Sequence, residues 1–453
     1  MSKLFGTSGI RDIVNLKITP QLVVQVGQAL ATYTKAKQIL TGMDTRTTSP
    51  MLQYGLVAGI TACGANVLQQ GLVPTPVLAY LTGKTRADAG VMITASHNTP
   101  EYNGMKLYNP DTTAFNHVQQ DKIESLISKR QFKLAKWQDV GKTIDIDETR
   151  QYIEMIEEIR LKKPWKLIID PGNGATGLLA PRIFRETGCN VVAINSQPDG
   201  YFPGRGPEPD QESLKPLCNM VRSLRADAGI AYDGDGDRMV AVDEKGRITS
   251  PDQSFAAYGA YAVSKRKNKT MVTNVEASMC VERMVEAKGG KIVRTKVGDV
   301  SITEAVKKSK AAFGGEPCGA WIHPEYHYCP DGILSSILLL QALEETGLSL
   351  SEFVSKVPKY PIFRKNIQCI SSAKDSVLQR ASETFPKIFS GIKDQSTLDG
   401  LRLVFPEAWL LVRPSGTEPV VRITVEGETA GVAEQILQKA VKEVLKLVGE
   451  AIK

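Results

Sequence analysis

The sequence has no run of apolar residues that approaches the roughly 20 needed for a membrane-spanning helix. Its longest apolar stretch, residues 333–343, is interrupted by serines and is typical of a buried helix. The N-terminal segment MSKLFGTSGIRD reaches a charge pair within twelve residues and lacks the apolar core of a signal peptide. We therefore expect neither a membrane segment nor a secretion signal.

Cysteine pairing is also lacking. The chain has 7 cysteines, an odd number, and no two of them are spaced as Cys-x-x-Cys. An even count or a close pair is typical of disulfide frameworks and redox motifs, so this pattern favours reduced thiols and a cytoplasmic location.

No charge of one sign dominates the chain. It carries 56 Lys and Arg against 49 Asp and Glu, which gives a net charge of +7. This mild, diffuse excess suits an anionic small molecule but does not indicate nucleic acid. We expect no nucleic-acid or membrane partner, and the sequence leaves open whether the chain is a monomer or a homo-oligomer.

One strand–helix–strand unit occurs three times, which predicts three similar α/β domains. Each copy has a first strand, a helix that ends near a glycine, a second strand and then a third strand. The third strands of the first two copies begin with the same Ala-Asp-Ala-Gly sequence, at residues 87–90 and 226–229. The first strands are expected at residues 38–43, 166–170 and 269–274.

A polar loop follows the third strand in every copy, at residues 94–98, 233–238 and 314–319. In parallel α/β sheets, ligands bind beyond the carboxyl ends of the strands. Three equivalent loops would therefore face one shared cleft.

The pattern changes after about residue 360. Residues 401–412 and 420–426 have the composition of strands, and apolar residues recur at helical spacing over residues 431–448. This predicts a smaller α+β domain at the C-terminus. Candidate boundaries divide the chain into residues 1–150, 151–251, 252–360 and 361–453.

The loop Asp233-Gly-Asp-Gly-Asp-Arg238 predicts a metal site. Its carboxylates, Asp233, Asp235 and Asp237, cannot lie close together without a cation, because like charges raise one another's pKa. The intervening glycines let the backbone turn so that all three carboxylates point inward. Oxygen ligands suit Mg²⁺, whereas a calcium-binding EF-hand would need a later Glu that is missing. The alternative is a solvated hairpin turn.

The loop Thr94-Ala-Ser-His-Asn98 offers the hydroxyl of Ser96. A serine is a weak nucleophile alone, but beside a metal it can carry and donate a phosphoryl group. His97 is expected to pack or hydrogen-bond nearby rather than bind the metal. Arg11 could lie near a phosphate, and Lys106 could assist proton transfer if neighbouring cations lower its pKa. Either could instead be a surface charge.

Two later loops have the composition of ligand-binding loops. The segment RPSGTEP, residues 413–419, combines a guanidinium, two hydroxyls and a glycine, which favours a phosphate cradle over a plain polar turn. The segment GEPCG places Glu316 on a turn framed by glycines, where its carboxylate can accept bonds from adjacent sugar hydroxyls. A zinc site is the alternative for the second segment, but Pro324 and uneven spacing argue against it. Its ligands would be Cys318, His323, His327 and Cys329.

Together the four loops resemble those of the α-D-phosphohexomutase superfamily, and the resemblance covers essentially the whole chain. That family has, in this order, a phosphoserine loop, a DGDGD metal loop, a GE-x-S-G sugar loop and an R-x-S-G-T-E-P phosphate loop. The resemblance implies an α/β fold of four domains around a central cleft, with mixed sheets in the first three. It also implies a hexose phosphate substrate, whose phosphoryl group moves between the C1 and C6 oxygens through a hexose 1,6-bisphosphate.

The resemblance also assigns roles to individual residues. Ser96 matches the phosphoserine and, with the three aspartates, completes the ligands of one Mg²⁺. Arg11, Lys106 and Arg238 match catalytic residues on the phosphoserine side. The positions that match substrate-binding residues are Glu316 and Cys318 in the sugar loop and Arg413, Ser415, Gly416 and Thr417 in the phosphate loop.

Three positions depart from the family pattern. Thr99 replaces a usual proline, Cys318 a usual serine, and Ala320 a histidine that some members have. These changes bear on substrate choice more than on phosphoryl transfer. The form GEPCGAW is similar to that of archaeal phosphoglucosamine mutases, so we expect glucosamine 6-phosphate as the substrate. The alternative is a phosphomannomutase/phosphoglucomutase with dual sugar specificity.

Two hypotheses from other classes remain. A phosphosugar-binding regulator without turnover would lack the donor serine or a metal aspartate, and neither is missing. A Mg²⁺-dependent phosphatase with an aspartyl nucleophile would need a strand-end Asp-x-Asp motif with a downstream lysine, and it would leave RPSGTEP without a role. Net release of inorganic phosphate would identify the phosphatase.

Overall fold

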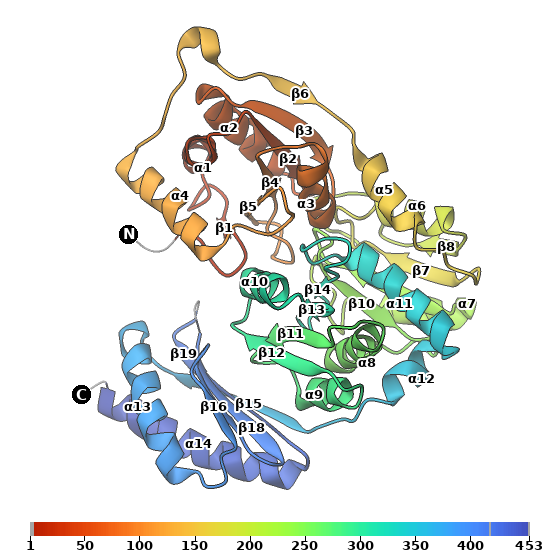
Figure 1. Cartoon of the computed structure of the whole chain (residues 1–453), viewed down its shortest axis with the longest axis vertical. Helices are drawn as coiled ribbons and strands as arrows, with labels where there is room; N and C mark the ends of the chain where they lie inside the picture. The colour runs from red at the N-terminus through yellow and green to blue at the C-terminus, as the bar shows by residue number, and fades with distance from the viewer. Residues whose placement is uncertain (1–3, 416–417, 452–453) are drawn as a thin grey trace.

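The computed structural model describes residues 4–415 and 418–451. Its strands form four sheets that follow one another along the chain, and Figure 1 shows the four corresponding domains. Within the described ranges, no helix is long and apolar enough to cross a membrane.

The first three sheets share one strand arrangement, as the repeated unit predicts. In each, the first strand of the unit lies between the second and third strands and runs parallel to both. A fourth strand pairs antiparallel with the third. These strands are β2 (Gln38–Met43), β3 (Asn66–Leu72), β4 (Ala89–Ile93) and β5 (Tyr102–Tyr108) in the first sheet, β7 (Lys166–Asp170), β8 (Asn190–Ala193), β9 (Ala228–Tyr232) and β10 (Met239–Val242) in the second, and β11 (Thr270–Asn274), β12 (Lys291–Thr295), β13 (Phe313–Gly315) and β14 (Trp321–Ile322) in the third.

The expected first strands are confirmed within one residue. Strands β2 and β7 have the predicted bounds, and β11 begins one residue later than expected. Two short strands, β1 (Ile10–Ile13) and β6 (Thr143–Asp145), extend the two edges of the first sheet. Each third strand returns through a hairpin into its antiparallel fourth strand, so each polar loop lies at a hairpin tip.

One large hydrophobic core runs through the first three domains. Successive residues of a strand face opposite sides of its sheet. Ile39 in β2 therefore packs in a core with α1 (Pro20–Thr34) and α2 (Ser49–Ala62), whereas Leu40 belongs to a second core with α3 (Thr75–Lys84). This second core continues into the next two domains through α5 (Thr149–Glu157), α8 (Pro251–Ser264) and α11 (Gly332–Thr346).

The predicted buried helix over residues 333–343 lies within α11, whose residues from Gly332 to Leu340 are all buried. The other helices of the first three domains are α4 (His117–Lys129), α6 (Leu179–Glu186), α7 (Lys215–Leu224), α9 (Met279–Glu286), α10 (Asp299–Ser309) and α12 (Leu350–Ser355).

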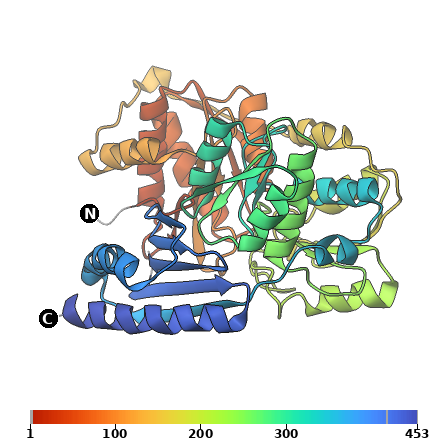
Figure 2. The same ribbon diagram turned by 60° about the horizontal axis from the view of Figure 1, so that its bottom comes forward.

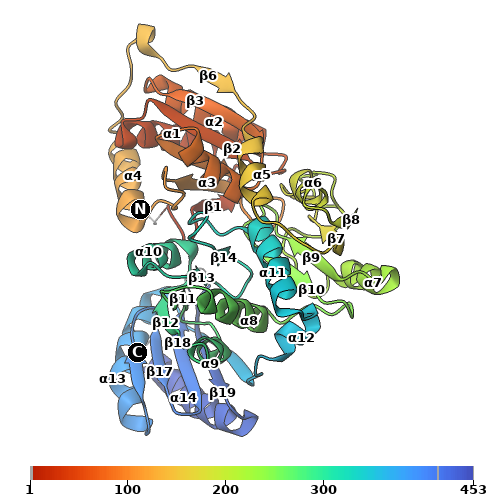
Figure 3. The same ribbon diagram turned by 45° about the vertical axis from the view of Figure 1, so that its right-hand side comes forward.

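The fourth domain has a separate core. Its antiparallel sheet packs against α13 (Lys374–Ile388) and α14 (Ala430–Ala451), which Figure 2 shows along one face of the sheet. Figure 3 shows this domain beside the third, and a small cluster of Val275, Trp409 and Leu411 packs between the two. The strand order is β15–β19–β18–β17–β16. The strands are β15 (Ile362–Gln368), β16 (Asp394–Ser396), β17 (Leu401–Val404), β18 (Ala408–Pro414) and β19 (Val420–Gly427).

The prediction of one strand over residues 401–412 is wrong. The segment forms a hairpin of β17 and β18, with Phe405 N donating to Ala408 O at 2.7 Å across the turn. Pro406 lies in this turn, where it removes no ladder hydrogen bond. The helix predicted over residues 431–448 is present as α14.

Candidate active site

The four polar loops connect antiparallel strands, and the second contacts both the first and the third. Residues 233–238 join β9 to β10, and residues 316–320 join β13 to β14. Met239 N, directly after the second loop, donates to Gly319 O of the third at 3.2 Å. Ser96 Oγ, in the first loop, donates to Asp233 Oδ2 at 2.7 Å. The serine hydroxyl and the acidic loop therefore meet in space, as the sequence predicts.

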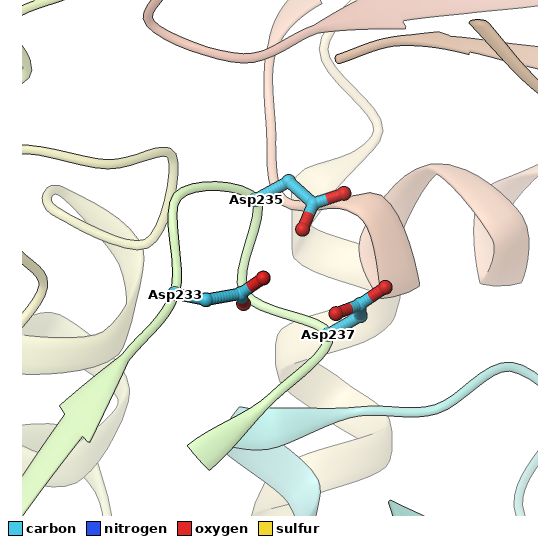
Figure 4. A group of neighbouring side chains, drawn as sticks. All are labelled: Asp233, Asp235 and Asp237. Carbon is cyan, nitrogen blue, oxygen red and sulfur yellow. The ribbon is translucent and has the colours of Figure 1, made fainter. Parts of the chain in front are cut away.

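The three aspartates form one tight carboxylate group. Asp233, Asp235 and Asp237 are buried, and one oxygen of each lies within 4.8 Å of the other two (Figure 4). Oδ1 of Asp235 and Oδ1 of Asp237 are buried without a hydrogen-bond partner in the described part of the chain. Buried carboxylate oxygens without partners are costly, so this donor set fits a divalent cation that prefers oxygen ligands.

The backbone of the metal loop wraps around Asp233. Its Oδ1 accepts from Gly236 N at 3.0 Å and from Arg238 N at 3.1 Å. Gly236 has φ +78°, and a Cβ there would lie 2.3 Å from Thr176 Cγ2. This position therefore requires glycine both for its backbone conformation and for space.

A buried arginine that sequence reasoning missed holds the serine loop. Arg46 is 1% exposed, and its guanidinium pairs with Asp44 at 3.0 Å. Asp44 Oδ2 accepts from Thr94 Oγ1, which in turn accepts from Ser96 N. Arg46 also donates to the carbonyl oxygens of Ser96, Asn98, Thr99 and Tyr102. The signal in the sequence is weak: Asp-x-Arg follows β2 at the same sheet edge.

Lys106 lies against the carboxylates. Its Nζ donates to Asp235 Oδ2 at 2.8 Å and to Asp237 Oδ2 at 2.5 Å. Burial would lower the pKa of Lys106, but these two carboxylates outweigh burial and raise it. The expectation of a lowered pKa is therefore wrong, because the nearest charges are negative. Thr75, at the start of α3, also holds Asp235 through its hydroxyl at 2.5 Å, a contact that the sequence did not indicate.

The other two predicted catalytic cations, Arg11 and Arg238, lie near the serine loop. Arg11 Nη1 donates to Asn98 Oδ1 at 3.5 Å, and Arg238 Nη1 lies 3.6 Å from a carboxylate oxygen of Glu208. His97 Nδ1 is 3.3 Å from Ser96 Oγ. Burial, with the charges of Arg238 and Arg11, lowers the pKa of His97 to about 3, so this imidazole is neutral near pH 7.

Glu316 of the third loop is held by two donors. Its Oε1 accepts from Asn274 Nδ2 at 2.7 Å and from Gly298 N at 3.1 Å. Burial raises the pKa of Glu316, and these two hydrogen bonds partly offset that effect. Cys318 is exposed two residues later, and Ala320 is buried. Asn274 was not identified from the sequence, although it ends β11 at the predicted sheet edge.

Arg413 of the fourth loop has two acidic neighbours. Its Nη1 is 3.0 Å from Glu276 Oε1, and its Nε is 3.0 Å from Asp399 Oδ2. Ser415 Oγ accepts from Glu418 N. A buried lysine, Lys374, donates to the backbone carbonyl oxygens of Ser415 and Glu418. The other two predicted residues of this loop, Gly416 and Thr417, lie outside the described residues.

The alternative of a zinc site is not supported. Among the described residues, His, Cys, Asp and Glu side chains come close enough together to hold a metal at the three aspartates. The four candidate zinc ligands have other surroundings. His323 contacts Ser335, His327 contacts Asp331, Cys329 contacts Tyr108, and Cys318 is exposed.

Family models match nearly the whole chain. Domains I, II and III of phosphoglucomutase/phosphomannomutase, each described as alpha/beta/alpha, match residues 2–134, 150–246 and 250–360. The C-terminal domain of the same family matches residues 367–443.

Curated relatives match over nearly their full lengths. The probable phosphoglucosamine mutase of Methanothermobacter thermautotrophicus is 43% identical over 440 residues, which is 96% of both chains. The phosphoglucosamine mutase of Methanocaldococcus jannaschii is 41% identical over 100% of this chain and 99% of its own.

Solved structures share the fold. A phosphoglucomutase/phosphomannomutase family protein from Burkholderia thailandensis superposes with a TM-score of 0.88 at 26% identity, covering 99% of this chain and 98% of its own. A structure described as a putative phosphomannomutase from Thermus thermophilus superposes with a TM-score of 0.80 at 26% identity, covering 97% and 98%.

Proposed function

Because this chain belongs to the phosphoglucomutase/phosphomannomutase family, we propose that it interconverts glucosamine 6-phosphate and glucosamine 1-phosphate through a phosphorylated Ser96. The chain is an intramolecular phosphotransferase of the phosphohexomutase type. The observation that carries the proposal is the 2.7 Å contact between Ser96 Oγ and Asp233, because it brings the donor hydroxyl to the metal-binding carboxylates.

Mg²⁺ is the proposed metal, with Asp233, Asp235, Asp237 and a Ser96 phosphoryl oxygen as its ligands. The unpartnered Oδ1 atoms of Asp235 and Asp237 support this set. A bound Mg²⁺ supplies positive charge that stabilises the serine oxygen as the phosphoryl group leaves. Lys106, which already bridges two of the carboxylates, limits the excess negative charge around the ion.

In the proposed reaction, Ser96 gives its phosphoryl group to the free hydroxyl of the hexose phosphate. The bond from phosphorus to the serine oxygen breaks as a bond to the sugar oxygen forms, and the proton of the sugar hydroxyl ends on the serine oxygen. Arg11, Lys106 and Arg238 stabilise the transferring group. The product is a hexose 1,6-bisphosphate. It turns end for end and returns its other phosphoryl group to Ser96.

Glu316 and the fourth loop hold the part of the substrate that does not react. Glu316 would accept hydrogen bonds from two sugar hydroxyls, since Asn274 and Gly298 fix its carboxylate. Arg413 and Ser415, with Gly416 and Thr417, would grip the distal phosphate. Binding energy at this remote end orients the reacting end.

Ser96→Ala tests the donor assignment. We expect mutase turnover to fall by about a thousandfold or more, because the only proposed phosphoryl donor is lost. Thermal unfolding should change little, and the intact mass of the wild-type protein should include a fraction heavier by one phosphoryl group that the variant lacks. Normal turnover in the variant would contradict the donor assignment.

The sugar is a separate question. A coupled assay should compare the 6-phosphates of glucosamine, glucose and mannose with a trace of hexose 1,6-bisphosphate. The proposal expects glucosamine 6-phosphate to give the highest kcat/KM. Dual phosphomannomutase/phosphoglucomutase activity is the second candidate, favoured by the likeness to the Burkholderia and Thermus structures. It would give comparable kcat/KM values for glucose and mannose.

A further inference from the structure

The phosphate-binding arginine is already engaged by carboxylates. Arg413 Nη1 lies 3.0 Å from Glu276 Oε1, and the opposite side of the guanidinium lies 3.0 Å from Asp399 Oδ2. The Arg413 side chain is 18% exposed and that of Glu276 is 41% exposed. A phosphate that binds either bidentate edge of Arg413, Nη1 with Nη2 or Nε with Nη2, therefore meets a nitrogen that already faces a carboxylate, and the two anions compete for it.

The two carboxylates differ in what remains when Arg413 turns to a phosphate. Asp399 Oδ2 also accepts from Val297 N at 3.0 Å, so Asp399 keeps a hydrogen bond to the third domain. Glu276 has no other side-chain partner among the described residues. Displacement by phosphate therefore leaves the Glu276 carboxylate without its cation.

Glu276 also belongs to the surroundings of the sugar loop. Its backbone N–H donates to Asn274 Oδ1 at 2.9 Å, and Asn274 Nδ2 donates to Glu316 Oε1 at 2.7 Å. One amide side chain thus links Glu276 to the proposed sugar-reading carboxylate. Glu276 therefore contacts both Arg413, the proposed phosphate residue, and Asn274, which holds the proposed sugar residue Glu316.

A carboxylate beside a bound phosphate is unfavourable unless a positive charge accompanies the phosphate. A neutral hexose brings no such charge. The C2 amino group of a glucosamine phosphate does when it is protonated, and C2 is directly bonded to the phosphate-bearing carbon of the 1-phosphate.

We propose that Glu276 is a specificity-determining residue: it occupies Arg413 until the distal phosphate displaces it, and the released carboxylate then favours a sugar that carries an ammonium group. This inference rests on the proposed function, whose distal phosphate site and hexose phosphate substrates it uses. It adds the reason why a charged sugar is preferred to a neutral one.

Glu276→Gln tests both halves of the proposal. The ratio of kcat/KM for glucosamine 1-phosphate to that for glucose 1-phosphate, in which the distal phosphate is next to C2, should fall by about twofold to fivefold, the range for a partly exposed charge pair. Inorganic phosphate, used as a competitive probe of the distal site, should bind more tightly to this variant, because it no longer competes with a carboxylate for Arg413.

Glu428→Gln is the matched control. Glu428 also forms an ion pair between the fourth and third domains, with Arg283 at 2.6 Å, but it lies away from Arg413 and Glu316. This variant should keep the wild-type selectivity ratio and phosphate affinity. An equal change in both variants would mean that domain attachment, rather than the charge at position 276, sets the ratio, and the proposal would be wrong.

The outcomes separate this inference from the proposed function. A wild-type enzyme without turnover of any hexose phosphate would overturn the proposed function itself. A wild-type enzyme that ignored glucosamine 6-phosphate but used neutral hexose phosphates would overturn the sugar assignment and this inference together. A preference for glucosamine 1-phosphate over glucose 1-phosphate that survives unchanged in Glu276→Gln would overturn this inference alone.

Discussion

At the residue scale, each of the first three domains braces its strand ends with an arginine. Arg46 pairs with Asp44 and binds the carbonyls of the serine loop. Arg205 pairs with Asp170 and donates to Tyr232 O, directly before the metal loop. Arg294 pairs with Glu282 and donates to the carbonyl oxygen of β11's last residue. A guanidinium suits this task because its planar fork reaches several carbonyls at once.

Arg46→Lys tests this bracing. A lysine keeps the charge but cannot replace the several directed donors, so we expect kcat to fall at least tenfold and the free energy of unfolding to fall by about 2–4 kcal/mol. Steady-state kinetics and thermal unfolding would measure the two effects. Arg150→Lys, on an exposed helix, is the control and should change neither quantity. An unchanged kcat in Arg46→Lys would show that the loop holds its shape without Arg46.

At this scale, some residues of the site could be predicted from the sequence and others could not. Ser96 and the three aspartates were identifiable because loops at equivalent strand ends carry them. Arg46, Asn274 and Lys374 were not, because their partners are backbone atoms or distant side chains that no local pattern reveals. The pKa direction of Lys106 failed for the same reason: the sequence did not show that its nearest charges belong to Asp235 and Asp237.

At the scale of elements, helix α11 begins against the metal loop. Gly332 N donates to Gly236 O at 3.1 Å. A Cβ at Gly332 would lie 2.8 Å from Arg238 O and 2.9 Å from Gly236 O. A helix of the third domain thus limits the position of a loop of the second.

Gly332→Ala tests this contact. The added methyl group must push the metal loop and α11 apart, at a cost of about 1–3 kcal/mol in unfolding free energy. We expect the Mg²⁺ concentration for half-maximal activity to rise about tenfold, measured by titrating the metal-depleted enzyme. Gly431→Ala in α14 is the control, because nothing lies within 4 Å of a Cβ there. Equal metal titrations in both variants would count against the contact.

The elements themselves were largely predictable. The repeated Ala-Asp-Ala-Gly segments located the third strands, and the strand-end glycines located the turns. The hairpin of β17 and β18 was missed because apolar residues continue on both sides of Pro406, so that periodicity alone did not divide the segment. The antiparallel fourth strand of each unit is also absent from the sequence pattern, because it follows a tight polar loop rather than a helix.

At the scale of the whole molecule, one buried carboxylate helps to anchor the fourth domain. Glu426 is 2% exposed and accepts from Ser278 Oγ, from Met279 N at the start of α9, and from Trp409 Nε1, at 2.6 to 2.7 Å. Donors from the third and fourth domains therefore bind the same carboxylate. The small apolar cluster beside Trp409 joins the same two domains, as do the ion pairs of Arg413 with Glu276 and of Glu428 with Arg283.

Glu426→Gln tests this anchor. The amide would offer two N–H donors where three donors already point, so we expect the attachment of the fourth domain to weaken by about 1–3 kcal/mol. Calorimetry should show the fourth domain unfolding at a lower temperature than the other three, and KM should rise as the phosphate loop loses its position. The exposed Glu428 provides the comparison, since its ion pair is worth little. A single unchanged transition in Glu426→Gln would contradict this role.

The backbone contact between Met239 and Gly319, with that between Gly332 and Gly236, bears on how such enzymes can be recombined. The first bond joins the residue after the metal loop to the sugar loop, and the second joins the metal loop to the start of α11. The sugar loop and α11 both belong to the third domain, so a third domain transplanted from a relative would bring foreign contacts to the metal loop. The fourth domain meets the rest through side chains around Glu426 and Arg413. It is the module whose exchange would disturb the metal least.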